Sequence, residues 1–437
     1  MPTAGPVGSY SQESPYLPQE LIDSCFDFLV NDKTTLRKCL SVSPTTLAAS
    51  RRHLFRAVDI KPSCWLSPSR TEQICDKFRA FWETSRHLLR YVKVLVVETN
   101  LNHRRLREDL TTLFTGCELE EFRFSLMLSG TDEGWEDVSH FLTTWSTWSL
   151  VTLELENINY FPYDFLRSFP NLKVLRFCPG HNIATPAQIS ENIHQETLPP
   201  KGCIALCELQ ISDCIDEPTW FHLARCIDYS SLRKVVIIHR SDTVQPQIEA
   251  FLDCAAPYIE DLVWRPPHIL VTEQAASYPA LQLGRFTKLR TLELRGPHLL
   301  TWESDRNVVK WICNTLTTLP INSPLENLVL DFPFRDLYSI TPSRQTYFCP
   351  YPHASGRCTI SPSVEPTSGR ARRHFAQLDR KLLRLVNLKR VYFASHEREV
   401  RVFGEMRARG KLVITRRDIC WGEAAFAFWD ECTRSSG

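Results

Sequence analysis

Cysteine and histidine are the residues whose spacing could first suggest chemistry in this chain. Cys203, Cys207, Cys214 and Cys226 lie in one short stretch, and clustered thiolates can hold zinc. Structural zinc sites, however, usually pair ligands two to four residues apart at both ends, and here only Cys203 and Cys207 are that close. We therefore expect unligated thiols in this stretch and no metal.

A second set of possible metal ligands lies in a segment rich in Pro, Ser and Gly. It consists of Cys349, His353, Cys358 and His374. This spacing is no closer to a zinc motif than the first, so a metal that staples the segment is the less favoured alternative. The sequence predicts neither a metal nor a cofactor.

Catalytic motifs are absent from the sequence. It contains no G-x-S-x-G elbow, no Walker-type phosphate loop, no G-x-G-x-x-G and no H-E-x-x-H. With only 15 glycines, the chain is also poor in the tight backbone approaches that phosphate sites need. We therefore predict a protein that is not an enzyme.

Residues 370–390 form a basic stretch with eight Lys or Arg residues and one acid, Asp379. Its leucines recur at helical spacing, which favours a helix that packs them inward and leaves a solvated basic face. The alternative is a docking surface for an acidic partner or for nucleic acid. No aromatic residues are interleaved for base stacking, so nucleic acid is not expected as a partner.

The composition indicates a soluble globular protein. Of 437 residues, 43% are apolar and 23% are charged, with a formal net charge of +1. This length predicts several domains or a repeat array. No basic and apolar leader and no apolar run of about 18 residues occurs, so no membrane association is expected. The 16 cysteines are scattered singly, as in reduced proteins, and a cytoplasmic or nuclear location is predicted.

Three short helices are expected near the N-terminus, after a disordered leader over residues 1–16. Leu21, Ile22, Cys25, Phe26 and Leu29 recur at the spacing of one helical face. Pro18 suits a first helical turn, and either Asp32 or Thr34 can cap the second helix. A unit of this size buries little surface, so we expect it to need a partner for full stability. The inward residues of the second and third helices are predicted to be Leu36, Cys39, Leu40, Val42, Leu47, Leu54 and Phe55.

A repeated pattern organises most of the remaining chain. The motif L-x-x-L-x-L, with any apolar residue at the L positions, begins at residues 92, 119, 150, 172, 206, 232, 259, 289, 325 and 388. The first nine starts lie 22 to 36 residues apart, near the period of a leucine-rich repeat. In each motif, alternate apolar residues share one face of a strand and the residues between them face solvent. Helical patterns lie between the strands, for example over residues 217–230 and 306–319.

The spacing of the repeated motif gives the expected domain boundaries. Residues 61–91 are predicted to be a helical linker, and residues 92–397 a leucine-rich-repeat-like solenoid. The stretch near 341–370 is predicted to be a flexible insertion. Residues 398–437 are expected to cap the solenoid with a further helix, a strand over KLVIT and a C-terminal helix that contains Trp421, Phe426 and Trp429.

The N-terminal segment resembles an F-box, the adaptor-docking module of receptor subunits of cullin-RING ubiquitin ligases. The resemblance rests on LPQELI (17–22), on Phe26 and Leu29, on DKTTLRKCLSVS (32–43) and on SRRHLF (50–55). The last of these is typical of fungal members. One departure is that Thr46 stands where the family has a tryptophan, with Pro44 before it. The repeats also resemble the C-terminal half of such proteins. The resemblance implies an α/β repeat fold, with a three-helix F-box over residues 17–60 followed by an irregular solenoid of about ten strand-helix units.

The resemblance also implies a function. Such a protein is the substrate receptor of an SCF-type ligase, in which the F-box binds a Skp-family linker protein, and through it a cullin. The repeats would bind a protein substrate whose identity the sequence does not give. The alternative is a leucine-rich scaffold outside any ligase, whose N-terminal helices only cap the solenoid. The positions that the family uses for the linker or for holding the helices together match Leu17, Pro18, Ile22, Phe26, Leu36 and Val42.

Overall fold

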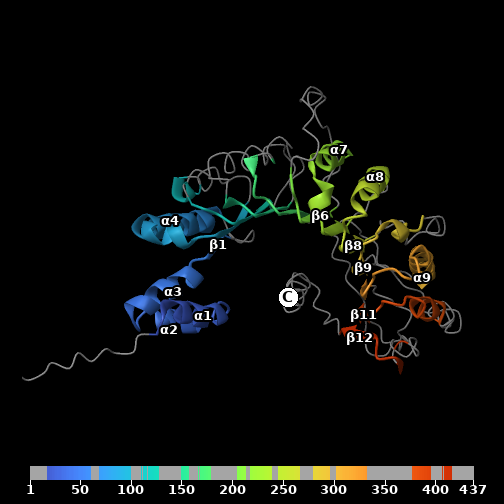
Figure 1. Ribbon diagram of the computed structural model, residues 1–437. Coiled ribbons are helices and arrows are strands. Elements are labelled where there is room, and N and C mark those ends of the chain that lie inside the picture. The colour runs from blue at the N-terminus through green and yellow to red at the C-terminus, as the bar shows by residue number, and fades with distance from the viewer. Residues whose placement is uncertain are drawn as a thin grey trace, which may run out of the picture. The chain divides into compact units, whose positions relative to one another are not determined.

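The computed structural model is an α/β structure in which parallel strands follow one another in chain order (Figure 1). The chain divides into two compact units, Met1–Ile158 with Ser168–Asn171 and Asn182–Thr185, and the remainder. The structure describes residues 17–60, 68–99, 110, 112–115, 117–126, 149–156, 166, 168–178, 204–212, 217–238, 245–265, 279–295, 302–331, 376–394, 406 and 408–415.

The first unit begins with the three predicted helices, α1 (Gln19–Phe28), α2 (Lys33–Cys39) and α3 (Pro44–Leu54). Pro18 directly precedes the first turn of α1, where its missing N–H is not needed. Asp32 caps α2, because its carboxylate accepts a 3.0 Å hydrogen bond from the Thr35 backbone N–H. Local sequence signals therefore fix where these helices start.

A small core holds the three helices together. Phe26 from α1, Leu36 from α2 and Ala49 from α3 are at most 5% exposed. The predicted inward stripe is partly wrong, because Leu21 and Cys25 are exposed. Val42 is also exposed, since it follows the end of α2 and no longer shares the helical face of Leu36. Partly buried residues that pack against this core are Ile22, Leu29, Cys39 and Leu54.

The sheet begins earlier than predicted. Strand β1 (Ala57–Ile60) lies inside the range assigned to the F-box, and it pairs in parallel with β2 (Val94–Thr99). The motif is present here as FRAVDI (55–60), and it places the buried Val58 and Ile60 on one face. Strands β3 (Glu121–Leu126) and β4 (Thr152–Glu156) continue the ladder.

The predicted linker is helical and belongs to the core of the first unit. It forms α4 (Pro68–Thr84) and the 3-10 helix η1 (Arg86–Tyr91). Trp82 is 3% exposed, and its ring lies 6.5 Å from that of Phe55 and 5.9 Å from that of Phe114. Phe55, which directly follows α3, therefore packs against Trp82 of α4.

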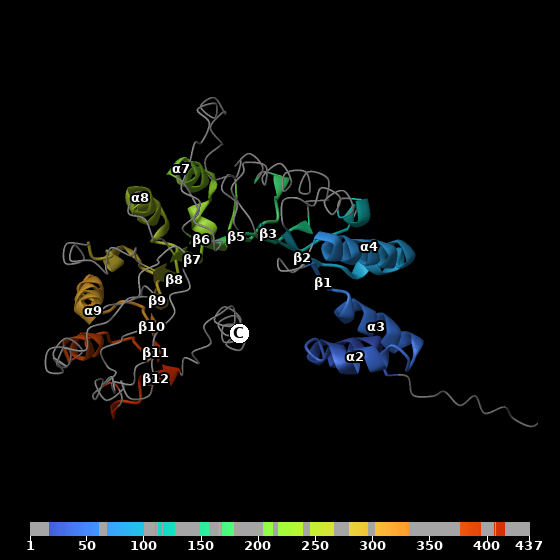
Figure 2. The ribbon, with the colours of Figure 1, turned by 180° about the vertical axis from the view of Figure 1, so that it is seen from behind.

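The second unit continues the same architecture. Figures 1 and 2 show α7, α8 and α9 along the outer side of the curved row of strands from β6 to β12. Its strands are β5 (Val174–Cys178), β6 (Glu208–Ser212), β7 (Lys234–Ile238), β8 (Asp261–Arg265), β9 (Thr291–Arg295), β10 (Asn327–Asp331), β11 (Arg390–Ala394) and β12 (Leu412–Thr415). Its helices are α7 (Glu217–Cys226), η5 (Tyr229–Ser231), α8 (Gln245–Ala255), η8 (Leu283–Arg285) and α9 (Trp302–Thr317).

The repeated motif is confirmed as the source of the strands. Each of its ten occurrences gives one strand from β2 to β11, and the predicted KLVIT strand is β12. The first apolar residue of each motif, such as Leu150 or Leu289, is at most 3% exposed. These side chains and the alternate strand residues form the core beneath the helices.

Helices between the strands close this core from one side. Trp220 and Leu223 of α7 and Ile312 of α9 are buried. In the basic stretch, residues 376–382 are helical, with Leu378 and Leu382 buried. No described helix is long and apolar enough to span a membrane. The predicted leader, the insertion near 341–370 and the terminal tryptophan-containing helix lie outside the described residues.

Candidate protein-interaction surfaces

Thr46 takes part in the N-terminal cap of α3. Ser43 is the N-cap, and its side chain accepts a 3.2 Å hydrogen bond from the Thr46 backbone N–H. The Thr46 hydroxyl accepts a hydrogen bond from the Ser43 N–H and reaches the Cys39 carbonyl at 3.0 Å. Pro44 fits the first helical turn. This sequence therefore uses position 46 to begin a helix and to tie it to α2.

Loss of this cap should weaken the three-helix unit. Ser43→Ala removes the acceptor for the Thr46 N–H, so we expect it to lower the free energy of unfolding by about 1 kcal/mol. Ser43→Asp keeps an acceptor and should retain most of that stability. Hydrogen exchange of the α3 amides measures both, and equal protection in Ser43→Ala and the parent would contradict the role of the cap.

Two polar side-chain contacts connect α3 to α1. Arg52 Nη1 lies 3.1 Å from Asp23 Oδ2, and His53 Nε2 lies 3.3 Å from Asp27 Oδ1. A hydrogen bond from Gln19 and the nearby Arg52 guanidinium lower the pKa of Asp23. Arg52 and His53, which lie in the segment SRRHLF (50–55), therefore hold the third helix against the first.

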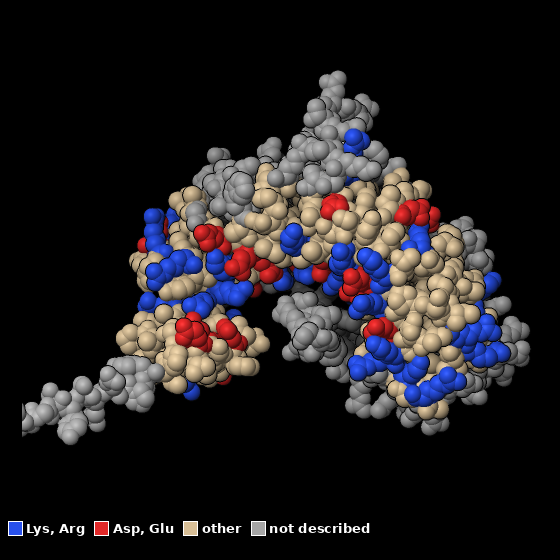
Figure 3. Space-filling view, viewed as in Figure 1, with Lys and Arg blue, Asp and Glu red and all other residues tan. Residues whose placement is uncertain are grey.

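Large apolar side chains remain exposed on the three-helix unit. Phe28 is 90% exposed, Val42 70% and Leu17 68%. The core of the unit is complete without them, so their burial is not what folds the helices. Figure 3 shows that the visible face of the unit, at lower left, is mostly uncharged. The exposed apolar set consists of Leu17, Leu21, Phe28, Val30 and Val42.

The six residues predicted to serve the linker contact fall into two groups. Leu17, Pro18 and Val42 are exposed and available to a partner. Phe26 and Leu36 are buried in the core, and Ile22 packs against it. Leu21 was assigned to the inward stripe by its spacing, and Phe28 and Val30, which do not fit that spacing, were given no role.

The strand side chains that face away from the helices carry paired charges in the second unit. Arg176 lies 3.0 Å from Glu208, which also lies 3.3 Å from Lys234. Gln210, another predicted outward residue, donates a hydrogen bond to the Cys178 sulfur at 3.5 Å. In the first unit, the outward Glu154 likewise lies 3.7 Å from Arg123.

Glu293 corrects the expectation that all outward strand positions face solvent. It is 6% exposed, and it stands in register between Val263 and Val329. Burial raises the pKa of the Glu293 carboxyl, and the Arg295 guanidinium 2.5 Å away opposes that shift. Val236 and Ile238 are buried on the same side, where they form a cluster with Val263. Strands that are apolar on both faces explain the difference.

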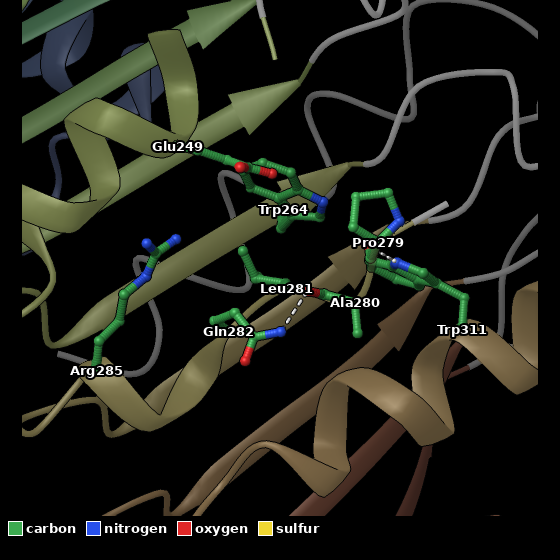
Figure 4. Close-up of a pocket in the computed structure, with 8 residues that line it drawn as sticks. All are labelled: Glu249, Trp264, Pro279, Ala280, Leu281, Gln282, Arg285 and Trp311. Atoms are coloured by element: carbon green, nitrogen blue, oxygen red, sulfur yellow. Dashed lines mark hydrogen bonds between the residues drawn. The ribbon is translucent and has the colours of Figure 1, made fainter. Parts of the chain in front are cut away.

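One cavity lies within the second unit (Figure 4). Trp264 of β8 and Trp311 of α9 line it, and Trp311 Nε1 donates a 3.1 Å hydrogen bond to the Pro279 carbonyl. Glu249 and Arg285 are the charged residues of its lining. Its volume is about 110 Å³. Small-molecule sites usually occupy roughly 300–1,000 Å³, so we assign no substrate to this cavity.

The two sets of Cys and His residues that were considered as possible metal ligands are only partly described. Cys207 is exposed at the start of β6 and Cys226 is buried at the end of α7, whereas Cys203 and Cys214 lie outside the described residues. The whole second set, from Cys349 to His374, also lies outside them. Across the described part of the chain, no group of three or more His, Cys, Asp or Glu residues could hold a metal ion.

Buried thiols should be distinguishable from exposed ones by their reactivity. Burial raises the pKa of Cys117 and of Cys313 to about 11. The thiolate is the reactive form, so at pH 8 we expect these residues to alkylate about 100-fold more slowly than an ordinary thiol. Peptide-resolved iodoacetamide labelling should modify the exposed Cys25 and Cys254 first. Labelling of Cys313 at the rate of Cys254 in the folded protein would contradict the burial.

Comparison with known proteins adds no relative. No family model matches this chain, and no curated protein matches it.

Proposed function

We propose that this protein is the substrate receptor of an SCF-type cullin-RING ubiquitin ligase. The three-helix unit would be an F-box that binds a Skp-family linker and through it a cullin. The parallel strands and their helices would form a leucine-rich-repeat solenoid that binds a protein substrate. The chain itself would have no catalytic role, and it would act in the cytoplasm or nucleus.

The exposed apolar set carries this proposal. Apolar residues that a unit does not need for its own core, and that remain exposed on it, are typical of a protein-binding surface. Phe28 and Val42 are such residues in a segment whose sequence resembles an F-box. Leu17, Pro18 and Val42 would contact the linker, whereas Ile22, Phe26 and Leu36 would hold the helices in place.

The repeat region supports the second half of the proposal. The described helices lie on one side of strands that run in chain order, and on the other side Arg176 and Gln210 of β5 and β6 are partly exposed and could contact a partner. The paired charges around Glu208 would then limit which substrates fit, since an incoming segment must compete with Arg176 and Lys234. A receptor of this kind acts by raising the local concentration of its substrate near the conjugating enzyme.

Assembly of the ligase tests the proposal. The full chain should co-elute with a Skp-family linker in size-exclusion chromatography, and a cullin should join only when the linker is present. The alternative function, a scaffold whose N-terminal helices only cap the repeats, predicts that the chain elutes alone in both mixtures. Elution of the chain alone would therefore reject the receptor function.

A further inference from the structure

Basic side chains gather at the C-terminal end of the second unit. Figure 3 shows Lys and Arg residues concentrated at lower right, where β11 and β12 lie in Figure 1. Lys411 is partly exposed and the other members are exposed. We name this group the end patch, and it consists of Arg380, Arg384, Lys389, Arg390, Arg409 and Lys411.

Acids do not balance the end patch among the described residues. Glu326 is a partly exposed acid beside the end patch, and its carboxylate lies 2.8 Å from the Lys389 ammonium. Asp379 is 5% exposed and accepts a hydrogen bond from the Met406 backbone N–H at 3.3 Å. Lys381 is not counted in the end patch, because its ammonium donates a hydrogen bond to the Cys313 carbonyl in the last turns of α9. No such contact with an acid joins Arg384 or Arg409 in the described part of the chain.

The residues that directly precede each strand show that the charge pattern at this end differs from that of the neighbouring strands. Residues that precede successive strands alternate in sign through Arg233, Glu260, Arg290, Glu326 and Lys389, and a backbone hydrogen bond of 2.7–2.8 Å joins each to the next. Opposite charges on neighbouring strands stabilise such a row.

The alternation stops after Lys389. The register of β11 and β12 sets Val391 opposite Leu412, so Arg390 lies beside Lys411 rather than beside an acid. Like charges on adjacent strands are unfavourable unless an outside group neutralises them.

We propose that the end patch docks an acidic segment of a partner protein. If the function proposed above holds, that partner is the substrate, and an acidic segment is the feature by which it is recognised. Arg384 and Arg409 have no acidic partner among the described residues and belong to a group of cations on adjoining turns and strands. Such a group complements a run of Asp and Glu residues and would also speed association. Basic residues on a terminal strand can instead serve only to discourage pairing with other chains.

Fluorescence anisotropy with the full-length chain tests this surface. The probe is a labelled peptide of alternating Glu and Ser, and a Gln-Ser peptide is its neutral control. We expect saturable binding of the acidic peptide only, weakened about tenfold when salt rises from about 50 to about 300 mM. Arg384→Glu with Arg409→Glu should weaken binding at least about tenfold. Lys77→Glu with Arg86→Glu, which alters exposed cations of the first unit, should change it less than about twofold.

Three results would overturn the proposal. They are no saturable binding by the parent chain, equal losses in the two double variants, and tighter binding of a single-stranded oligonucleotide than of the acidic peptide. Arg384→Gln with Arg409→Gln repeats the test if charge reversal disturbs folding, which circular dichroism reports. The Arg384/Arg409 variants should still bind the Skp-family linker. Peptide binding without linker binding would reject the ligase function and leave the docking surface in place.

Discussion

Phe28→Asp combined with Val42→Asp should strongly weaken binding to a Skp-family linker while the three-helix unit stays folded. The two side chains are 90% and 70% exposed, so in the free protein each carboxylate would remain in water. In the complex they would be buried without a partner, at a cost of a few kcal/mol. Since 1.4 kcal/mol corresponds to a factor of ten, we expect the Kd to rise at least about 100-fold. Titration calorimetry measures the affinity.

Matched variants separate the surface from the fold. Phe28→Leu with Val42→Ile keeps the surface apolar and should bind within a few-fold of the parent. The aspartate variant should unfold with a free energy within about 0.5 kcal/mol of the parent, because exposed positions contribute little to stability. Binding of the aspartate variant at the parent affinity would show that Phe28 and Val42 are not part of a linker contact.

Leu36→Ala should have the opposite profile, with loss of the fold of the three-helix unit. Leu36 is fully buried between Phe26 and Ala49, and truncation of a buried leucine costs about 2–5 kcal/mol. A unit of three short helices has little stability to spare. We expect the amides of α1, α2 and α3 to lose protection from hydrogen exchange, while those of β7 to β10 keep theirs. Linker binding should fall as a consequence of unfolding.

Val42→Ala is the control for this prediction, because Val42 contributes nothing to that core and its truncation should leave protection unchanged. Retained protection of α1 to α3 in Leu36→Ala would contradict the core described for this unit. The contrast also shows that aspartate at Leu36 or Ile22 is a poor test of partner binding, since either residue would act first on folding.

The strands were predictable because the L-x-x-L-x-L motif indicates both where each strand lies and which of its residues face inward. Leu153 and Leu155, for example, are buried and the residues around them are partly exposed, as the alternation requires. Strand β1 was missed although Phe55, Val58 and Ile60 fit the same pattern, because Phe55 was assigned to the third helix, which ends at Leu54.

The interaction surfaces were less predictable, for two physical reasons. A stripe of apolar residues in a short helix is wide, so Leu21 could not be separated from Ile22 by spacing alone. The burial of Glu293 depends on Val263 and Val329, which lie far away in the chain and become its neighbours only through strand register. Sequence patterns identify single elements, whereas these environments come from the pairing of several.

Titration of a purified Skp-family linker into the full chain tests the central claim most directly. The account predicts a saturable one-to-one complex with a Kd below about 1 μM, and a negative change in heat capacity as the exposed apolar set becomes buried. No heat of binding and no complex at about 100 μM of each protein would contradict it.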